Sequence, residues 1–424
     1  MVSQDNAPDV HPAIRLRTVL LLLGLSLLTR GAYLLAVRGP DAPLVGDEPG
    51  FHQIAAGCLA GEGWHDGPYY STRAPLPSAI LIPIYALTGA RPEVGRWTMV
   101  AISSWVAPLL YVIERWVFKR RLALAGWIWA LYPPSIFYAS FLLSENLAAT
   151  LSAACLGTFI ASGLTRRVGL AFLTGILWAA LALTRPVFLL LPFFLLGMNL
   201  LLPRTTPGRW GGRSTVLALA GFALAMAPWT IRNAVVHHRF MPTTSYGGIM
   251  LSSTNATLGH PAVQSGAYYH DPEIRRPLQQ LPEVEWNAAG LQLAVERIRQ
   301  YPGLFLEAVA HRAVNFWSPR PNPYNPNWSA SDGIMLALWL PLLLAFALSF
   351  TRHPWREDWP VLGMILYATL SILPFWGTPR FRFPVDPQII LRASAGLIWL
   401  PSIWGHLVTR LKRPRRADSH HPDS

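Results

Sequence analysis

Residues 46–78 have the sequence GDEPGFHQIAAGCLAGEGWHDGPYYSTRAPLPS and lie between two strongly apolar segments. The stretch contains two adjacent acids, Asp47 and Glu48, and an arginine, Arg73, which precedes a Pro-rich apolar run. Charged side chains beside a bilayer are costly unless they pair or have a function. We therefore expect this loop to hold the chemistry of the protein, and the rest of the chain to be the scaffold around it.

The composition is typical of a polytopic membrane protein. Of the 424 residues, 52% are hydrophobic and only 13% are charged, whereas an ordinary soluble domain has about 25% charged residues. The 18 Trp and 38 Pro agree, because aromatic residues gather at membrane interfaces and transmembrane helices tolerate Pro. The net charge of +13 comes mainly from arginines that flank apolar spans. This pattern favours membrane orientation and anionic lipids over a nucleic-acid partner.

Apolar stretches of about 20 residues, the length that crosses a bilayer, recur along the whole chain. They occur at 15–37, 76–90, 97–118, 121–139, 141–163, 168–184, 186–202, 214–230, 333–350, 358–376 and 385–408. We expect an all-α protein with about 10–12 transmembrane helices, which form a single membrane-embedded domain over residues 1–424.

Short basic loops predict the orientation of these helices. They lie at Arg15 and Arg17, 119–121, 166–167, 204–213, 352–356 and 410–416. With these loops in the cytoplasm, the loop 38–75, the turns near Ser144 and Arg185, the segment 231–332 and the turn 377–384 face outward. An odd number of stretches conflicts with two cytoplasmic termini. Between residues 76 and 118, either one segment does not fully cross or one basic loop is on the wrong side.

The segment 231–332 is too polar to span a membrane and too long for a turn. From Trp286 to Phe316 it has a helical pattern in which apolar and charged residues alternate. Two interpretations remain open for this amphipathic stretch: a helix on the membrane surface, or a packing helix within an external cap.

Three acids are candidates for chemistry. Asp47 and Glu48 follow the first span, where a carboxylate can accept a proton from an attacking hydroxyl or amine. The alternative is an exposed acidic loop in which Asp-Glu-Pro starts a short helix. Glu145 interrupts an apolar run, and an acid at this depth either has a function or forms a structural ion pair with an arginine.

Four arginines fall at the same predicted membrane level as these acids: Arg73, Arg185, Arg380 and Arg382. A single one, such as Arg73, is explained by a side chain that reaches back to the interface. A guanidinium group also matches the oxygens of a phosphate. The convergence of four arginines on one face therefore predicts a bound anion.

Histidines at positions 52, 65, 260 and 270 also lie in the predicted external segments. None has the spacing of a zinc site, so we expect no dedicated metal site. A divalent cation that bridges a bound phosphate to Asp47 or Glu48 remains open.

Several short motifs occur together in a particular order. They are the Asp47-Glu48 pair, Arg73-Ala74-Pro75-Leu76, Ser144-Glu145, Thr184-Arg185-Pro186, residues 228–233 (PWTIRN) followed by Gly247-Gly248, and residues 380–384 (RFRFP). In this order they resemble glycosyltransferase family 39. This group of GT-C membrane enzymes includes protein O-mannosyltransferases and the transferases that add aminoarabinose to lipid A. The resemblance covers roughly residues 15–400.

The resemblance implies a GT-C fold and a transferase that takes a sugar from a polyprenyl phosphate at the external face of the inner membrane. Asp47 matches the family's general base, Glu48 its partner, and Arg73 the basic residue that faces the lipid phosphate. The implied transfer inverts the anomeric configuration. Phe51 stands where the family often has a tyrosine, so Tyr69 or Tyr70 would supply the missing hydrogen bond. Glu145, His52 and Tyr69 are expected to support the site.

Two other functions fit the same residues. In a transporter or flippase of lipid-linked sugars, the acids and arginines would line a substrate pathway. No inverted repeat is evident, which counts against this interpretation. A non-catalytic relative that acts as an assembly partner is the second alternative, because of Phe51. The sequence leaves open which sugar is moved and whether the acceptor is a glycan, a lipid or a protein.

Overall fold

The computed structural model describes residues 13–120, 122–260, 272–325, 327–351, 355–356 and 358–411, with side chains except at 272–275 and 399–411. Within these ranges the regular structure is helical, apart from one isolated bridge between Asp66 and Tyr69. The predicted all-α fold class is confirmed.

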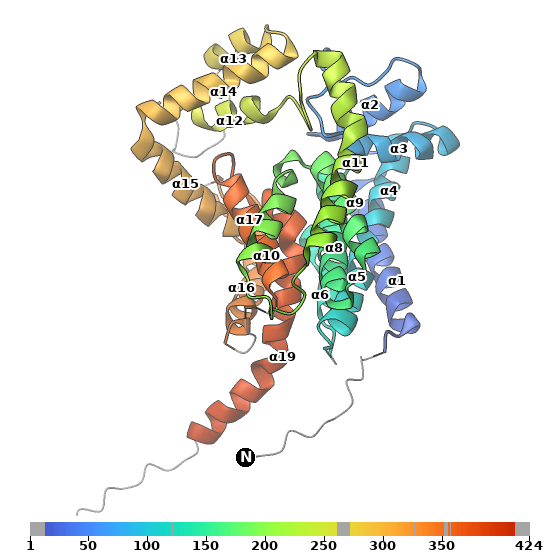
Figure 1. Cartoon of the computed structure of the whole chain (residues 1–424), viewed down its shortest axis with the longest axis vertical. Helices are drawn as coiled ribbons and strands as arrows, with labels where there is room; N and C mark the ends of the chain where they lie inside the picture. Colours follow the sequence, from blue (N-terminus) through green and yellow to red (C-terminus); the bar gives the residue numbers. More distant parts are fainter. Residues whose placement is uncertain are drawn as a thin grey trace, which may run out of the picture.

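Long and short helices together form a bundle, which is the lower part of the molecule in Figure 1. Its helices are α1 (Leu16–Tyr33), α4 (Pro92–Ser104), α5 (Val106–Val112), α6 (Ala125–Leu131), α7 (Pro133–Ala139), α8 (Ser144–Thr165), α9 (Val168–Thr184), α10 (Leu191–Leu201), α11 (Gly212–His237), α16 (Ala330–Ser349), α17 (Trp359–Ile372) and α19 (Asp386–Leu411). Backbone groups inside lipid must find partners within their own segment, which makes the helix the stable form for these apolar runs. Large aromatic side chains fill the core, where Phe159 stacks on Trp210 with ring centroids 4.3 Å apart.

Five segments of the described chain are long and apolar enough to cross a membrane: Leu16–Arg38, Pro92–Val117, Ser144–Thr165, Gly212–His237 and Ala330–Ser349. Four shorter apolar helices accompany them: Pro75–Thr88, Val168–Thr184, Pro186–Leu201 and Trp359–Ile372. The protein is a multi-pass membrane protein.

Helix α3 (Pro75–Thr88) accounts for the odd number of predicted spans. Its 14 residues reach only about 21 Å, whereas the hydrocarbon core of a bilayer is about 30 Å thick. Figure 1 shows α3 across the end of the bundle, close to α2 (Glu48–Leu59), and not along the bundle axis. Its orientation across the bundle favours 76–90 as the predicted stretch that does not fully cross. Without it the predicted stretches number ten (eleven minus one), which agrees with both termini on one side.

The described residues between α11 and α16 include four helices above the bundle: α12 (Gly247–Asn255), α13 (Pro272–Gln279), α14 (Glu283–Gln300) and α15 (Pro302–Trp317). The single helical pattern predicted over 286–316 is broken at Pro302, because proline cannot donate the backbone hydrogen bond of a continuing helix. We call these four helices the cap.

Close packing holds α14 on α12. Trp286, Gly290 and Ala294 of α14 are buried at a spacing of four residues, so they share one face of the helix. On α12, a Cβ atom at Gly248 would lie 2.0 Å from the carbonyl oxygen of Asn287, which only glycine avoids. This buried face against α12 favours the packing helix over a helix on the membrane surface.

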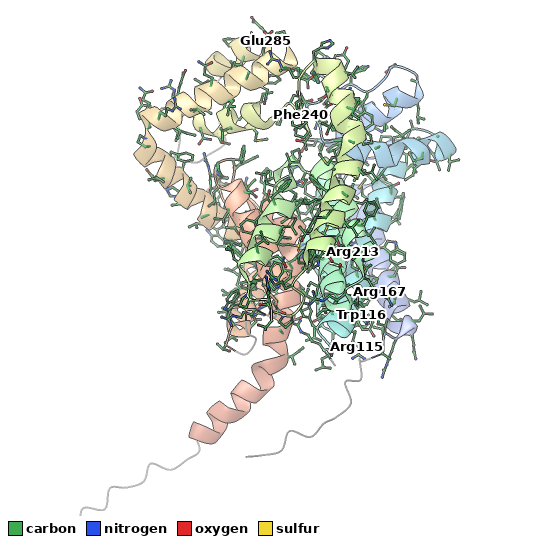
Figure 2. All side chains as sticks on the ribbon, viewed as in Figure 1. Arg115, Trp116, Arg167, Arg213, Phe240 and Glu285 are labelled. Atoms are coloured by element: carbon green, nitrogen blue, oxygen red, sulfur yellow. The ribbon has the colours of Figure 1, made fainter. Side chains whose placement is uncertain are left out.

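Basic side chains lie toward the other end of the bundle. Figure 2 shows Arg115 and Arg167 below the middle of the view and Arg213 near its middle, whereas Glu285 lies at the top of the cap. The basic loops that contain Arg167 and Arg213 therefore lie away from the top of the cap, as the charge pattern predicts.

Candidate active site

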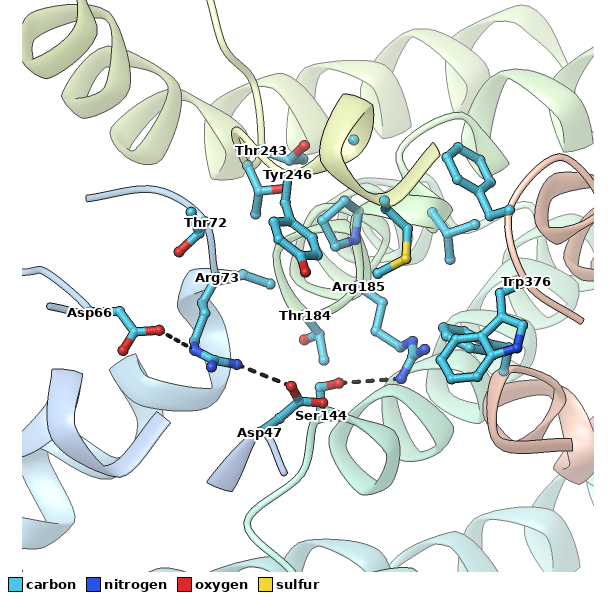
Figure 3. A pocket seen from close by; sticks show the side chains of 18 of the residues that line it. Asp47, Asp66, Thr72, Arg73, Ser144, Thr184, Arg185, Thr243, Tyr246 and Trp376 are labelled. Carbon is cyan, nitrogen blue, oxygen red and sulfur yellow. Dashed lines mark hydrogen bonds and ion pairs between the residues drawn. The ribbon is translucent and has the colours of Figure 1, made fainter. Parts of the chain in front are cut away.

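A cavity of about 760 Å³ lies between the end of the bundle and the cap. Its walls come from segments far apart in the sequence: the first loop with the start of α2, the start of α8, the end of α9, residues 243–250, and the segment after α17. Figure 3 shows the charged side chains that point into it.

Six charged groups of alternating sign form a chain of ion pairs, which we call the ion-pair chain; five of them line the cavity, and Glu145 is buried behind it. In order they are Asp66, Arg73, Asp47, Arg380, Glu145 and Arg185. Arg73 donates from Nε to Asp66 Oδ2 at 2.5 Å and from Nη1 to Asp47 Oδ1 at 3.3 Å. Arg380 donates from Nη2 to Asp47 Oδ2 at 2.5 Å. Asp47 is thus bound by two arginines from opposite ends of the chain.

The far half of the ion-pair chain is centred on Glu145. This carboxylate is fully buried at the start of α8 and accepts hydrogen bonds from Arg380 Nε. Arg185 Nη1 lies 3.0 Å from the same carboxylate and 3.3 Å from Ser144 Oγ. The guanidinium of Arg185 also stacks over the Phe381 ring at 5.1 Å. Glu145 therefore holds two cavity arginines in place.

Asp47 occupies the position just before α2 and lines the cavity with a side chain that is 43% exposed. Burial raises the pKa of Asp47, but Arg380 and Arg73 outweigh it and hold the pKa below its ordinary value. The carboxylate is therefore ionised and accessible from the cavity.

Space for Arg73 is provided by Gly50 in the first turn of α2. A Cβ atom at Gly50 would lie 1.9 Å from Arg73 Nε, so any other residue there would displace the guanidinium. Phe51, which also lines the cavity, lies under Arg73 with 5.6 Å between the guanidinium carbon and the ring centroid. The residue that departs from the family pattern thus supports an arginine.

Glu48 does not line the cavity. Its side chain is fully buried, and Arg96 Nε and Arg38 Nη2 each donate to it at 3.1 Å. Backbone N–H groups of Val45 and Leu142 donate to the same carboxylate at 2.9 and 3.0 Å. Both oxygens of Glu48 are engaged by these groups, which tie the first loop to α4 and to the residues just before α8. The side chain of Glu48 therefore does not reach the cavity beside Asp47.

Arg382 and His52 also lie away from the cavity lining. Arg382 is 2% exposed and donates to Asp386 Oδ1 at 2.9 Å. Its guanidinium stacks over Trp339 at 3.8 Å. His52 Nδ1 is 2.9 Å from the hydroxyl of Tyr85. Tyr69, in contrast, lines the cavity beside Trp286 of the cap, with ring centroids 5.4 Å apart.

Sequence analysis missed Asp66, the end of the ion-pair chain. It lies in the turn Asp66-Gly67-Pro68-Tyr69, in which Asp66 N–H donates to Tyr69 O at 2.7 Å and Gly67 has a φ of +60°. The Asp-Gly-Pro sequence is a turn signal. A turn that places an acid seven residues before Arg73 was the available indication that Asp66 pairs with this arginine.

The two ends of the cavity differ in chemistry. Around Arg185 and Arg380 the wall is apolar and aromatic, with Val187, Ile372, Phe375, Trp376 and Phe381. On the side of Asp66 and Arg73, Figure 3 shows Thr72, Thr243 and Tyr246, and Trp286 of the cap packs on Tyr69.

Among the described residues, no three His, Cys, Asp or Glu side chains are grouped to hold a metal ion. The two cavity-lining acids, Asp47 and Asp66, are bridged by Arg73.

The helical membrane bundle, its cap and the cavity between them define the class of fold: the GT-C fold of membrane glycosyltransferases, as the motifs implied. The chain is similar to the archaeal oligosaccharyltransferase AglB from Archaeoglobus fulgidus, solved with an inhibitory peptide and a dolichol-phosphate. The TM-score is 0.56 at 14% identity, over 96% of this chain and 53% of that chain. A second structure of the Archaeoglobus fulgidus enzyme, tethered to an acceptor peptide, gives a TM-score of 0.54 at 14% identity, over 93% and 51%.

This chain therefore spans about half the length of these oligosaccharyltransferases. ArnT from Cupriavidus metallidurans, bound to undecaprenyl phosphate, matches with a TM-score of 0.43 at 13% identity, over 96% of this chain and 82% of that chain. No family model matches the sequence. No curated protein matches it either.

Proposed function

We propose that this protein is a glycosyltransferase that moves a sugar from a polyprenyl-phosphate donor to an acceptor outside the cytoplasmic membrane. The observation that carries the proposal is the ionised, cavity-exposed Asp47 between two arginines. It lies in a GT-C fold similar to an enzyme that was solved with a dolichol-phosphate.

The donor fits the apolar end of the cavity. Its phosphate would contact Arg185 and Arg380, which Glu145 holds in place, and its lipid would follow the aromatic wall toward the bundle. Arginines fixed before the reaction stabilise the charge that develops on the leaving phosphate. Arg73 lies between two acids, Asp47 and Asp66, so we assign it to the positioning of Asp47 and not to the phosphate.

The acceptor fits the opposite end, beside Asp47 and the cap. Its hydroxyl or amine would attack the anomeric carbon on the face opposite the phosphate, while the bond from that carbon to the phosphate oxygen breaks. The proton of the acceptor goes to Asp47, and the lipid phosphate leaves with the bonding electrons. This single displacement inverts the anomeric configuration and needs one base.

Donor binding would also strengthen that base. Arg380 contributes to the low pKa of Asp47, which makes the carboxylate a weak proton acceptor. A phosphate that draws Arg380 toward itself would weaken this pairing and raise the pKa of Asp47. Proton transfer is then favoured only when the donor is bound.

The orientation of the site follows from the charge pattern. The arginines of the basic loops that lie away from the top of the cap, including Arg167 and Arg213, would face the cytoplasm. The cavity would then open on the external side of the inner membrane.

The test is to reconstitute the purified protein in lipid nanodiscs and supply polyprenyl phosphates that each carry a different sugar. Mass spectrometry follows the free polyprenyl phosphate and the glycosylated product, with total envelope lipids, glycans and proteins as acceptors. If the protein transfers sugar, free polyprenyl phosphate and glycosylated product should appear together, and one sugar should be preferred.

In sealed vesicles that contain the protein, movement of lipid-linked sugar across the bilayer without any glycosylated product would contradict the proposal and favour a transporter. Comparison of envelope material from cells with and without the protein then identifies the acceptor, because the transferred sugar adds a fixed mass to it.

A further inference from the structure

Glu283, in the first turn of α14, is a carboxylate outside the cavity that links the cap to the first loop. It is 8% exposed. Its Oε2 accepts from the backbone N–H of Tyr70 at 2.6 Å, and its Oε1 from that of Ser71 at 2.8 Å. The hydroxyl of Ser245 also donates to Oε1. Both oxygens are therefore engaged by groups from two other segments.

These two segments form adjoining parts of the cavity wall. Tyr70 and Ser71 adjoin Tyr69, Thr72 and Arg73, and Ser245 adjoins Thr244 and Tyr246, all of which line it. The segments also pair directly, since Ser245 N–H donates to Ser71 O at 3.0 Å. Glu283 is thus bonded to both segments while its own helix carries Trp286 into the cavity.

We call the contacts among Glu283, residues 70–71 and Ser245 the junction. The end of α11 also contributes to it. Asn233 Oδ1 accepts from Ser71 Oγ at 2.8 Å, and its Nδ2 donates to Thr243 O at 2.9 Å. Arg232 donates from Nη1 to Ser71 Oγ at 2.7 Å and from Nη2 to Trp64 O at 3.0 Å. The Arg-Asn pair of the PWTIRN motif therefore serves the same junction, and not the cavity itself.

We propose that Glu283 is a positioning residue that couples the cap to the ion-pair chain. It fixes residues 69–73, and through them Arg73, which bonds both Asp47 and Asp66. A cap held in place by Glu283 keeps Asp47 oriented toward the acceptor. This inference rests on the proposed function only for its effect on transfer, because the coupling of the two segments is a property of the fold.

An acid in the first turn of a helix is also favoured by the helix dipole alone. Glu285 lies in the same first turn and is exposed. The helix dipole therefore acts on it as well, but its side chain is not buried in the junction. Glu285→Gln is therefore the matched control for Glu283→Gln.

The first measurement is hydrogen–deuterium exchange on the purified full-length protein in nanodiscs. Glu283→Gln replaces a charged acceptor by a neutral one with a single oxygen, so the amides of Tyr70 and Ser71 lose charge-assisted bonds. We expect exchange in peptides that cover 69–73 and 243–247 to rise about tenfold or more, with bundle peptides unchanged. Glu285→Gln should leave both unchanged.

The second measurement is a double-mutant cycle on the transfer rate. If Glu283 acts through Arg73, Glu283→Gln lowers kcat about tenfold in the wild-type background and less than about twofold in an Arg73→Lys background. A purely structural role would lower the rate by the same factor in both.

Unchanged exchange at 69–73 in Glu283→Gln would overturn the coupling, whatever the protein's activity. If Glu283→Gln lowers kcat by the same factor in the wild-type and Arg73→Lys backgrounds, Glu283 does not act through Arg73. Absence of transfer by the wild-type protein would refute the proposed function and leave the exchange result standing. Should Glu283→Gln fail to fold, Ser245→Ala removes only the hydroxyl contact, and exchange at 69–73 must still rise.

Discussion

Asp47 is a base only if its neighbours allow it to accept a proton. Burial alone would raise its pKa, and the low pKa results from Arg380 first and Arg73 second. Since a lowered pKa keeps a carboxylate ionised at every pH above its ordinary value of about 4, the wild-type enzyme should keep its kcat/KM, which reports the free enzyme, between about pH 8 and pH 5 as far as Asp47 is concerned.

Replacement of Arg380 by glutamine tests this balance. Burial then opposes only Arg73, so the pKa of Asp47 rises and the acidic limb of the kcat/KM profile moves to higher pH. The measurement is the transfer rate across pH 4–8 for wild type and Arg380→Gln. An acidic limb at the same pH in both proteins would show that Asp47 is not the titrating group.

Unlike Asp47, Glu48 should be needed for the stability of the protein and not for proton transfer. Glu48→Gln leaves Arg38 and Arg96 without their shared buried carboxylate, which costs about 3 kcal/mol or more when one partner of a buried pair is removed. We expect lower thermal stability in detergent and little folded protein. A variant of wild-type stability that lacks transfer would instead return Glu48 to the catalytic machinery.

Gly50 separates stability from activity in one small change. Alanine in a helix is about 0.5–1 kcal/mol more stable than glycine, yet its Cβ atom would collide with Arg73. Gly50→Ala should therefore fold normally and transfer about ten- to a hundredfold more slowly. The matched control is Gly57→Ala on the same helix, whose Cβ would approach only the end of Glu62, at 3.1 Å. Equal transfer rates in the two variants would refute the positioning role of Arg73.

Adjacent residues could not be told apart from the sequence. Asp47 and Glu48 are both acids at the start of one helix, and only the tertiary structure puts one in the cavity and the other against Arg96. The same holds for Arg380 and Arg382, two residues apart in a short helix. Residue type and membrane level were predictable, but side-chain direction depends on packing by distant segments.

At the scale of elements, α3 has the clearest consequence. Because it lies across the end of the bundle and not along its axis, the loop that follows it should be on the same side of the membrane as the first loop. Cysteines at Tyr70 and Arg91, both exposed, should therefore react with an impermeant thiol reagent from the same side, and a cysteine at Arg167 from the other.

The background for this experiment needs only Cys58→Ser, because Cys58 is half-buried and Cys155 is fully buried. Labelling of intact and permeabilised cells compares the three positions. Labels on Arg91→Cys and Tyr70→Cys from opposite sides would mean that α3 spans the membrane after all.

The cap was predictable only in outline. Its amphipathic pattern was visible in the sequence over 286–316, but Pro302 was not recognised as the break between two helices. The choice between a membrane-surface helix and a packing helix depended on α12, whose Gly247-Gly248 start accommodates α14. A helix pattern shows which face is apolar, and the partner of that face comes from elsewhere in the chain.

At the scale of the molecule, composition and hydrophobic runs were sufficient for the fold class, because lipid permits few backbone structures. The cavity was harder to predict. Its ion-pair chain joins Asp47 to Arg380, 333 positions apart, and no local pattern encodes that contact. Asp66 was missed for a related reason, since a single acid in a polar turn has no signal until Arg73 is seen beside it.

The measurement that tests the central claim most directly is sugar transfer by Asp47→Asn with a defined polyprenyl-phosphate donor. The substitution keeps the size and exposure of the side chain and removes its charge and basicity. The account predicts that the variant inserts, folds and binds donor, and that its transfer falls to background while wild type turns over in parallel. Near-normal transfer by folded Asp47→Asn would remove Asp47 from the mechanism and contradict the account.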